Sequence, residues 1–106
     1  MKIDMAQRLK FTVILEPEAD GGYSVHCPAL AGCVSQGGSR KEALKNILEA
    51  ISLVLAVMEE KGISIPTETP EVIVAEIREI LKAREGDGLP LTIETAQVQV
   101  PLEVAV

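Results

Sequence analysis

Apolar and polar residues alternate along three short segments in the first third of the chain. Residues 9–16 place four apolar side chains on one face, as in a strand buried on one side, namely Leu9, Phe11, Val13 and Leu15. Residues 23–27 and 33–36 repeat this pattern, after a turn at 17–22 and a bend at 28–32 that are marked by Gly and Pro. The pattern predicts a three-stranded antiparallel meander whose apolar face needs a cover.

A long helix over residues 40–61 is predicted to supply that cover, because its apolar residues recur at three- and four-residue steps. Ser39 suits the N-cap, Glu42 completes a capping box, and Gly62 suits the C-cap. The second half of this helix is apolar nearly all round, so one sheet face cannot cover it. We expect the C-terminal elements of the chain to cover the excess, helped by dimerisation, and a second subunit is the alternative.

The last third of the chain predicts a second helix and a long strand. Thr69 and Pro70 suit the N-cap and first helical position, and residues 86–88 end the helix. Its expected apolar face consists of Val72, Ile73, Ile77, Ile80 and Leu81. Its late cations, favoured by the helix dipole, are Arg78, Lys82 and Arg84. Residues 92–106 then alternate as a strand with one buried face, formed by Ala96, Val98, Val100, Leu102, Val104 and Val106, and Pro101 argues for a sheet edge or a bend.

The predicted fold class is α+β, a meander covered by a long helix and followed by a second helix and a long C-terminal strand. Residues 1–8 are a lead-in, residues 9–66 form a β-β-β-α domain, and residues 67–106 form a helix–strand extension. We expect this extension to pack on the same core. A chain of 106 residues is about one domain.

Composition and charge narrow the classes of partner. The net charge of −6 disfavours direct nucleic-acid binding, which needs clustered Lys and Arg, and it suits either a basic partner or simple solubility. The longest apolar run, residues 50–58, is too short to span a bilayer. The start lacks an apolar signal-peptide core, and two cysteines make no disulfide framework. We therefore expect a soluble cytoplasmic protein with reduced thiols.

The residues with possible site chemistry are few. His26, Cys27 and Cys33 do not match the paired spacing of a zinc site, and adjacent strand positions send His26 and Cys27 to opposite faces. We predict a solvent-facing histidine and two buried thiols, with no metal, cofactor or nucleophile. Three acids near the first turn could hold Mg²⁺, but loop acids are more often simply solvated; they are Glu16, Glu18 and Asp20. Residues 37–41 could meet an anion, although a turn and a helix cap are the expected role.

Together these features resemble the HicB-type antitoxin domain over about residues 9–66. The matching stretch reads FTVILEPEADGGYSVHCPALAGCVSQGGSRKEALKNILEAI. It contains a strand ending in an acid, a DGGY turn, a C-P-x-L-x-G-C bend, an S-Q-G exit and an E-A-L-x-N-I helix start. The positions assigned to this motif, in a structural role, are Gly22, Tyr23, Cys27, Pro28, Leu30, Gly32, Cys33, Gly37, Ser39 and Glu42. The resemblance implies a partial RNase-H-like unit that forms a homodimer or higher oligomer.

The resemblance implies protein binding and no enzymatic activity. HicB-like antitoxins neutralise a small basic RNase toxin of the HicA type, so such a toxin is the expected partner. Two alternatives remain open: a stand-alone dimeric HicB-like scaffold, and a degenerate RNase-H-like metal-dependent nuclease. Many family members also bind DNA through a C-terminal helix-turn-helix or ribbon-helix-helix. Residues 70–106 predict a helix followed by a strand, which fits neither motif, so direct DNA binding is not expected.

Overall fold

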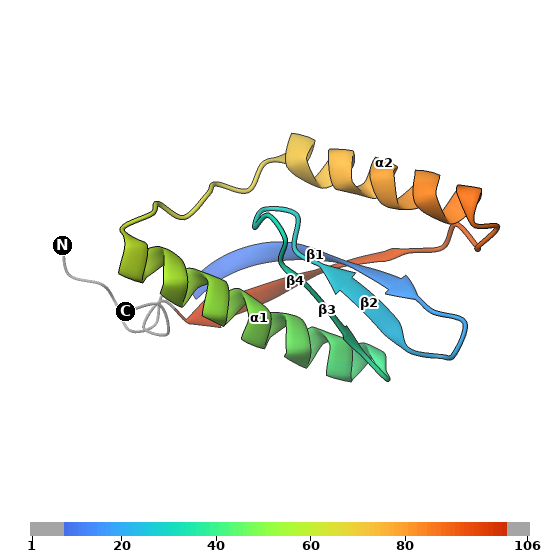
Figure 1. Ribbon diagram of the computed structural model, residues 1–106, viewed down its shortest axis with the longest axis horizontal. Coiled ribbons are helices and arrows are strands. Elements are labelled where there is room, and N and C mark those ends of the chain that lie inside the picture. The colour runs from blue at the N-terminus through green and yellow to red at the C-terminus, as the bar shows by residue number, and fades with distance from the viewer. Residues whose placement is uncertain (1–7, 102–106) are drawn as a thin grey trace.

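The computed structural model describes residues 8–101 as one antiparallel sheet with two helices (Figure 1). The elements in chain order are β1 (Arg8–Pro17), β2 (Tyr23–His26), β3 (Val34–Gly37), α1 (Arg40–Lys61), α2 (Pro70–Gly86) and β4 (Glu94–Pro101). The strand order is β3-β2-β1-β4. The predicted α+β class and the meander are confirmed. Most of the lead-in and the tail positions Leu102, Val104 and Val106 lie outside the described residues.

The second and third strands differ slightly from their predicted limits. β2 ends at His26 and β3 starts at Val34, whereas the prediction included Cys27 and Cys33. The reason is a closed loop between the two cysteines. The Cys27 amide donates to the Cys33 carbonyl over 2.9 Å, and two further backbone bonds cross the loop at Leu30. Gly32 takes a φ of 75°, a conformation that other residues rarely adopt.

Helix α1 covers one face of the sheet and has the predicted limits and caps. The Ser39 side chain accepts from the Glu42 amide, and Gly62 ends the helix in the left-handed conformation. The apolar core lies between this helix and the odd-numbered residues of β1. Its fully buried members include Val13, Leu15, Val25, Ala43, Ile47 and Ile51. The core is almost entirely aliphatic, as the composition requires.

Helix α2 lies on the opposite face of the sheet from α1 (Figure 1), and this corrects two predictions. Ile14 alternates with the four apolar residues of the first strand and so lies on the face for which no cover was predicted, yet it is fully buried. Val72, expected on the inner face of α2, is exposed, and Ile80 is buried there. The chain therefore covers both faces of the central strands, whereas the sequence pattern predicted one covered face.

The C-terminal elements were expected to cover the excess apolar surface of α1, and they do so only in part, because α2 lies on the opposite face of the sheet. Leu53 and Val57 on α1 are among the large exposed apolar side chains. Strand β4 contributes instead by pairing with β1, with Val98 opposite Phe11, and by adding Val98 and Val100 to the core beside α1. Pro101 belongs to β4, an edge strand of the described sheet, which is the first of the two settings predicted for it. Neither helix is long and apolar enough to cross a membrane.

Candidate functional site

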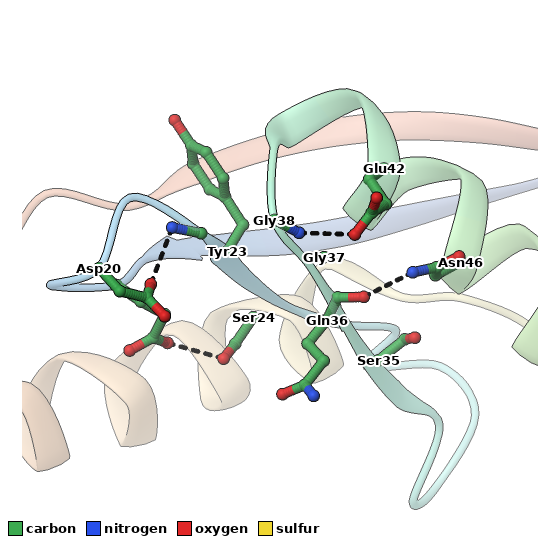
Figure 2. A pocket seen from close by; sticks show the side chains of 11 residues that line it. Asp20, Tyr23, Ser24, Ser35, Gln36, Gly37, Gly38, Glu42 and Asn46 are labelled. Carbon is green, nitrogen blue, oxygen red and sulfur yellow. Dashed lines mark hydrogen bonds between the residues drawn. The ribbon is translucent and has the colours of Figure 1, made fainter.

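An open groove of about 560 Å³ surrounds the end of β3 and the start of α1 (Figure 2). Three segments meet there: the β1–β2 turn, the paired ends of β2 and β3, and the first turns of α1. The lining residues are Glu18, Asp20, Gly22, Tyr23, Ser24, Ser35, Gln36, Gly37, Gly38, Glu42 and Asn46. All of them lie within residues 11–51, the stretch that carries the family resemblance.

Two glycines allow these segments to approach closely. A Cβ at Gly37 would lie 2.4 Å from the Ala43 amide nitrogen, and a Cβ at Gly22 would lie 2.8 Å from the Gly37 carbonyl oxygen. Both distances are far below van der Waals contact, and both involve backbone atoms that cannot move freely. Because these two positions carry no side chain, the start of α1 can pack directly against the β2–β3 pair.

The groove carries three carboxylates, each held by a neutral donor. Ser24 Oγ donates to Glu18 over 2.6 Å, the Gly22 amide donates to Asp20 over 2.9 Å, and the Gly38 amide donates to Glu42 over 2.7 Å. The Glu42 bond modifies the predicted capping box, because the donor precedes the N-cap residue by one. None of the lining residues is Lys or Arg. No cation of the lining therefore faces these carboxylates, although Lys41 and Lys45 lie on the other side of Glu42.

The outer edge of β3 forms the wall of the groove. A side chain of α1 binds one of the backbone groups on this edge. Asn46 Nδ2 donates to the Gln36 carbonyl over 2.7 Å, so this carbonyl points away from β2 and towards the helix (Figure 2). β3 is an edge strand of the sheet. The groove therefore combines exposed strand edge with acidic side chains, which suits a basic protein surface better than a small apolar ligand.

A second polar cluster lies beneath α2. His26 Nε2 is 2.6 Å from Glu16 Oε2, and His26 Nδ1 is 3.5 Å from Glu76 Oε2. Arg84, only 3% exposed, donates to the Pro90 carbonyl over 2.6 Å and to Glu16 Oε1 over 3.2 Å. His26 was predicted to face solvent, but it binds Glu16, because α2 packs over this face. Arg84 lies in the last turn of α2, as predicted, and in addition binds Glu16.

The two cysteines are buried in the α1 core, as predicted, and His26 lies on the other face of the sheet. Burial raises the pKa of the Cys27 thiol to about 12, with neighbouring Cys33 as the second cause. Burial also raises the pKa of Cys33. These thiols are therefore protonated at neutral pH and are poor nucleophiles. Within residues 8–101, no group of three or more His, Cys, Asp or Glu side chains could hold a metal ion.

The remaining candidate positions have separate local contacts. Glu16 binds His26 and Arg84 under α2, whereas Glu18 and Asp20 line the groove at the β3 edge. The structure does not bring these three acids to one point. Arg40, part of the possible anion site, donates through Nε to Glu94 Oε2 over 2.7 Å. That pair joins the start of α1 to the start of β4.

The motif positions fall into two places in the fold. Gly22, Tyr23 and Gly37 line the groove, with Ser39 and Glu42 at the adjoining helix cap. The others lie in the loop between β2 and β3, where Cys27, Leu30 and Cys33 are buried around Pro28 and Gly32. Their shared role as motif positions remains a prediction. The groove itself could not be located from sequence, because it depends on how closely α1 approaches the turn.

Comparison with known proteins gives consistent matches. The family described as HicB-like antitoxin of bacterial toxin-antitoxin system matches residues 11–88. A UPF0150 protein of Synechocystis is 43% identical over 68 residues, which cover 64% of this chain and 86% of that protein. A UPF0150 protein of Thermoplasma acidophilum is 43% identical over 65 residues, covering 61% and 94%. Antitoxin HicB 1 of Photorhabdus laumondii is 33% identical over 64 residues, covering 60% of this chain and 41% of that antitoxin.

Two solved structures share the fold. The N-terminal domain of the Burkholderia pseudomallei antitoxin HicB superposes with a TM-score of 0.62 at 24% sequence identity, covering 87% of this chain and 98% of that one. A chain of the HicA3 and HicB3 toxin-antitoxin complex superposes with a TM-score of 0.58 at 15% identity and the same coverage. At these identities the two structures establish the similarity of fold.

Proposed function

The chain belongs to the HicB-like antitoxin family, and from this membership we propose that it neutralises a small basic RNase toxin of the HicA type by binding it directly. The observation that carries the proposal is the acidic groove at the β3 edge. Its three carboxylates have neutral hydrogen-bond partners and no cation among the lining residues. A basic toxin surface would supply the missing positive charge.

The proposed interaction is electrostatic in origin and therefore fast and sensitive to salt. Opposite charges that face each other across an interface steer association and fix its orientation. The groove lies at an exposed edge, where an approaching protein meets little steric obstruction. One of the solved structures that share this fold is a toxin-antitoxin complex, and this supports a toxin as the binding partner here. Binding, with no chemistry of its own, is sufficient for neutralisation.

The test is a binding titration with any small basic protein that a gene adjacent to that of this chain encodes. We expect a stable complex that co-purifies and loses RNase activity. Replacing the three groove acids as Glu18→Gln, Asp20→Asn and Glu42→Gln should weaken binding by about tenfold or more, since each charged contact contributes on the order of 1 kcal/mol. Glutamine at position 42 keeps an acceptor for the Gly38 amide and so preserves the helix start.

A matched control removes the same charge elsewhere. Glu59→Gln, Glu60→Gln and Glu79→Gln are exposed positions away from the groove, and this triple variant should bind the toxin as the unaltered protein does. If both triple variants lose the same toxin affinity, the loss is due to the change in net charge and not to the groove. Failure of any basic neighbour to bind would favour the alternative of a stand-alone scaffold. The nuclease alternative has no supporting geometry, because its three acids do not converge.

A further inference from the structure

The outer edge of β3 carries backbone groups with which no strand of the described chain pairs. The Cys27 amide donates to the Cys33 carbonyl, so the backbone groups of Cys33 point towards the side of β2. Successive residues of a strand point to alternate edges, so the backbone groups of Val34 and Gln36 point away from β2. The bond from Asn46 to the Gln36 carbonyl agrees with this alternation.

Side chains of α1 occupy one end of this edge, and the rest of it is open. Asn46 binds the Gln36 carbonyl, and Glu42 accepts from the Gly38 amide. The amide and carbonyl of Val34 and the amide of Gln36 have no such partner among the described residues. The Val34 side chain is 58% exposed although it is apolar. Edge strands that stay unpaired commonly carry lysine or proline, and β3 has neither.

We propose that a strand of the basic toxin adds to β3 through these three backbone groups and so extends the sheet. The inference rests on the toxin-binding function proposed above and specifies how the toxin is held. When an extended segment adds to a sheet edge, main-chain hydrogen bonds give affinity and alternate side chains give specificity. Asn46 and Glu42 already occupy one end of the edge, so the added strand pairs with the segment from Val34 to Gln36.

Charge favours a basic protein over a second copy as the occupant of this edge. Glu18, Asp20 and Glu42 lie in the groove beside the same strand, and the lining of that groove contains no Lys or Arg. Two copies joined through β3 would bring both sets of carboxylates together, and like charges that face each other across an interface oppose binding. A basic strand meets opposite charge at the same place.

The other face of the β3 edge offers room for an apolar side chain of the added strand. A hollow of about 370 Å³ lies there, and its lining includes Glu16, Ser24, His26, Val34 and Gln36. Ser24 and Gln36 also line the acidic groove, so the two hollows meet around the edge. We therefore expect the toxin strand to carry an apolar residue beside Val34 and a basic residue at the end near Gly37, which lines the groove.

Amide hydrogen exchange on the full chain tests the proposal, with any small basic protein that an adjacent gene encodes as the probe. In the toxin-free protein the Val34 and Gln36 amides should exchange rapidly, because they point to solvent. In the complex both should exchange more slowly by about tenfold or more. The Ser35 amide points towards β2, so it is the internal control and should be protected in both states.

Proline substitution provides a second measurement, because proline has no amide donor. Val34→Pro deletes an outward donor without breaking a bond to β2, and should weaken toxin binding by about tenfold or more. Val34→Ala keeps the donor and should weaken binding less. Gln97→Pro is the matched control at the other edge: Thr12 donates to Glu68, so its partner Gln97 also points away from β1. This control should bind the toxin as the unaltered protein does.

Slow exchange at Val34 and Gln36 only in the complex, with selective weakening by Val34→Pro, supports strand addition. A complex in which both amides stay in fast exchange overturns it, as does equal binding by Val34→Pro and Gln97→Pro. If the triple variant of the groove acids still loses affinity in that case, the proposed function stands without strand addition. Protection of both amides in the toxin-free protein would mean that a second copy occupies the edge, and would also overturn the inference. If no adjacent basic protein binds, both proposals fail.

Discussion

The Glu68 carboxylate accepts two hydrogen bonds from Thr12, one from the backbone amide at 2.6 Å and one from Oγ1 at 2.9 Å. Thr12 lies in β1 just beyond the point where the pairing with β2 ends. The amide that would have paired with a neighbouring strand is thus satisfied by a side chain from the segment between α1 and α2. This contact fastens that segment to the sheet before α2 begins.

Removing the carboxylate of Glu68 should therefore destabilise the fold. Hydrogen bonds to charged groups contribute about 1.5–3 kcal/mol, so we expect Glu68→Ala to lower the free energy of unfolding by about 1–3 kcal/mol. Urea denaturation followed by circular dichroism measures this change. Glu60→Ala, at an exposed position near the end of α1, is the control and should change stability by less than about 0.5 kcal/mol. Similar values for the two variants would contradict the role of Glu68.

Arg84 anchors α2 to the sheet, and its loss should be costly. Arg84→Met removes the donor to the Pro90 carbonyl and to Glu16 Oε1 in a site that is largely shielded from water, and Glu16 keeps only its contact with His26. Breaking such a buried pair costs about 3–5 kcal/mol, and the partial exposure of Glu16 reduces our expectation to about 2–4 kcal/mol. The control is Arg78→Met, an exposed position on the same helix, which should be nearly neutral. Thermal unfolding of both variants measures the two changes in stability, and equal values would contradict the anchoring role of Arg84.

The close approach at Gly37 predicts a strong effect of a single methyl group. Gly37→Ala would force Cβ against the backbone of α1, and we expect a loss of about 1–3 kcal/mol together with a changed groove. Gly86→Ala is the matched control, because Cβ there meets nothing within 4 Å and the residue lies in a helix. It should raise stability by up to about 1 kcal/mol. A tolerated Gly37→Ala would show that α1 can shift away from the sheet.

The Arg40–Glu94 pair should contribute to the stability of the fold, and this contribution should be lost at acidic pH. The hydrogen bond from Arg40 holds the pKa of Glu94 below its ordinary value of 4.5. As pH falls, the unfolded chain takes up this proton first, so the stabilisation is complete above 4.5 and is lost as pH falls through the lower, folded value. An NMR titration of the Glu94 carboxyl measures the shift. Arg40→Gln should return the pKa towards 4.5, and Lys41→Gln should leave it unchanged.

Much of the fold follows from local chemistry that is visible in the sequence. The ends of α1 and the start of α2 are set by Ser39, Gly62 and Thr69, whose effects reach only a few residues. The placement of α2 could not be predicted in this way. The burial of Arg84 depends on Glu16, a partner 68 residues earlier in the chain, and the sequence pattern around either residue indicates only a solvated charge.

The candidate groove was predictable in its parts but not as a whole. Gly22, Gly37 and the capping residues mark turns and a helix start, and each motif has a local explanation. Glu18 and Asp20 lie in the same groove as Glu42 because the fold brings the β1–β2 turn and the first turns of α1 to the same side of β3. Acids separated by a strand, a loop and a second strand share no periodicity. Only the folded structure shows that these acids lie on the same surface.

The strand order β3-β2-β1-β4 places the acidic groove and the free β4 edge at opposite margins of the sheet. Occupation of one margin leaves the other open.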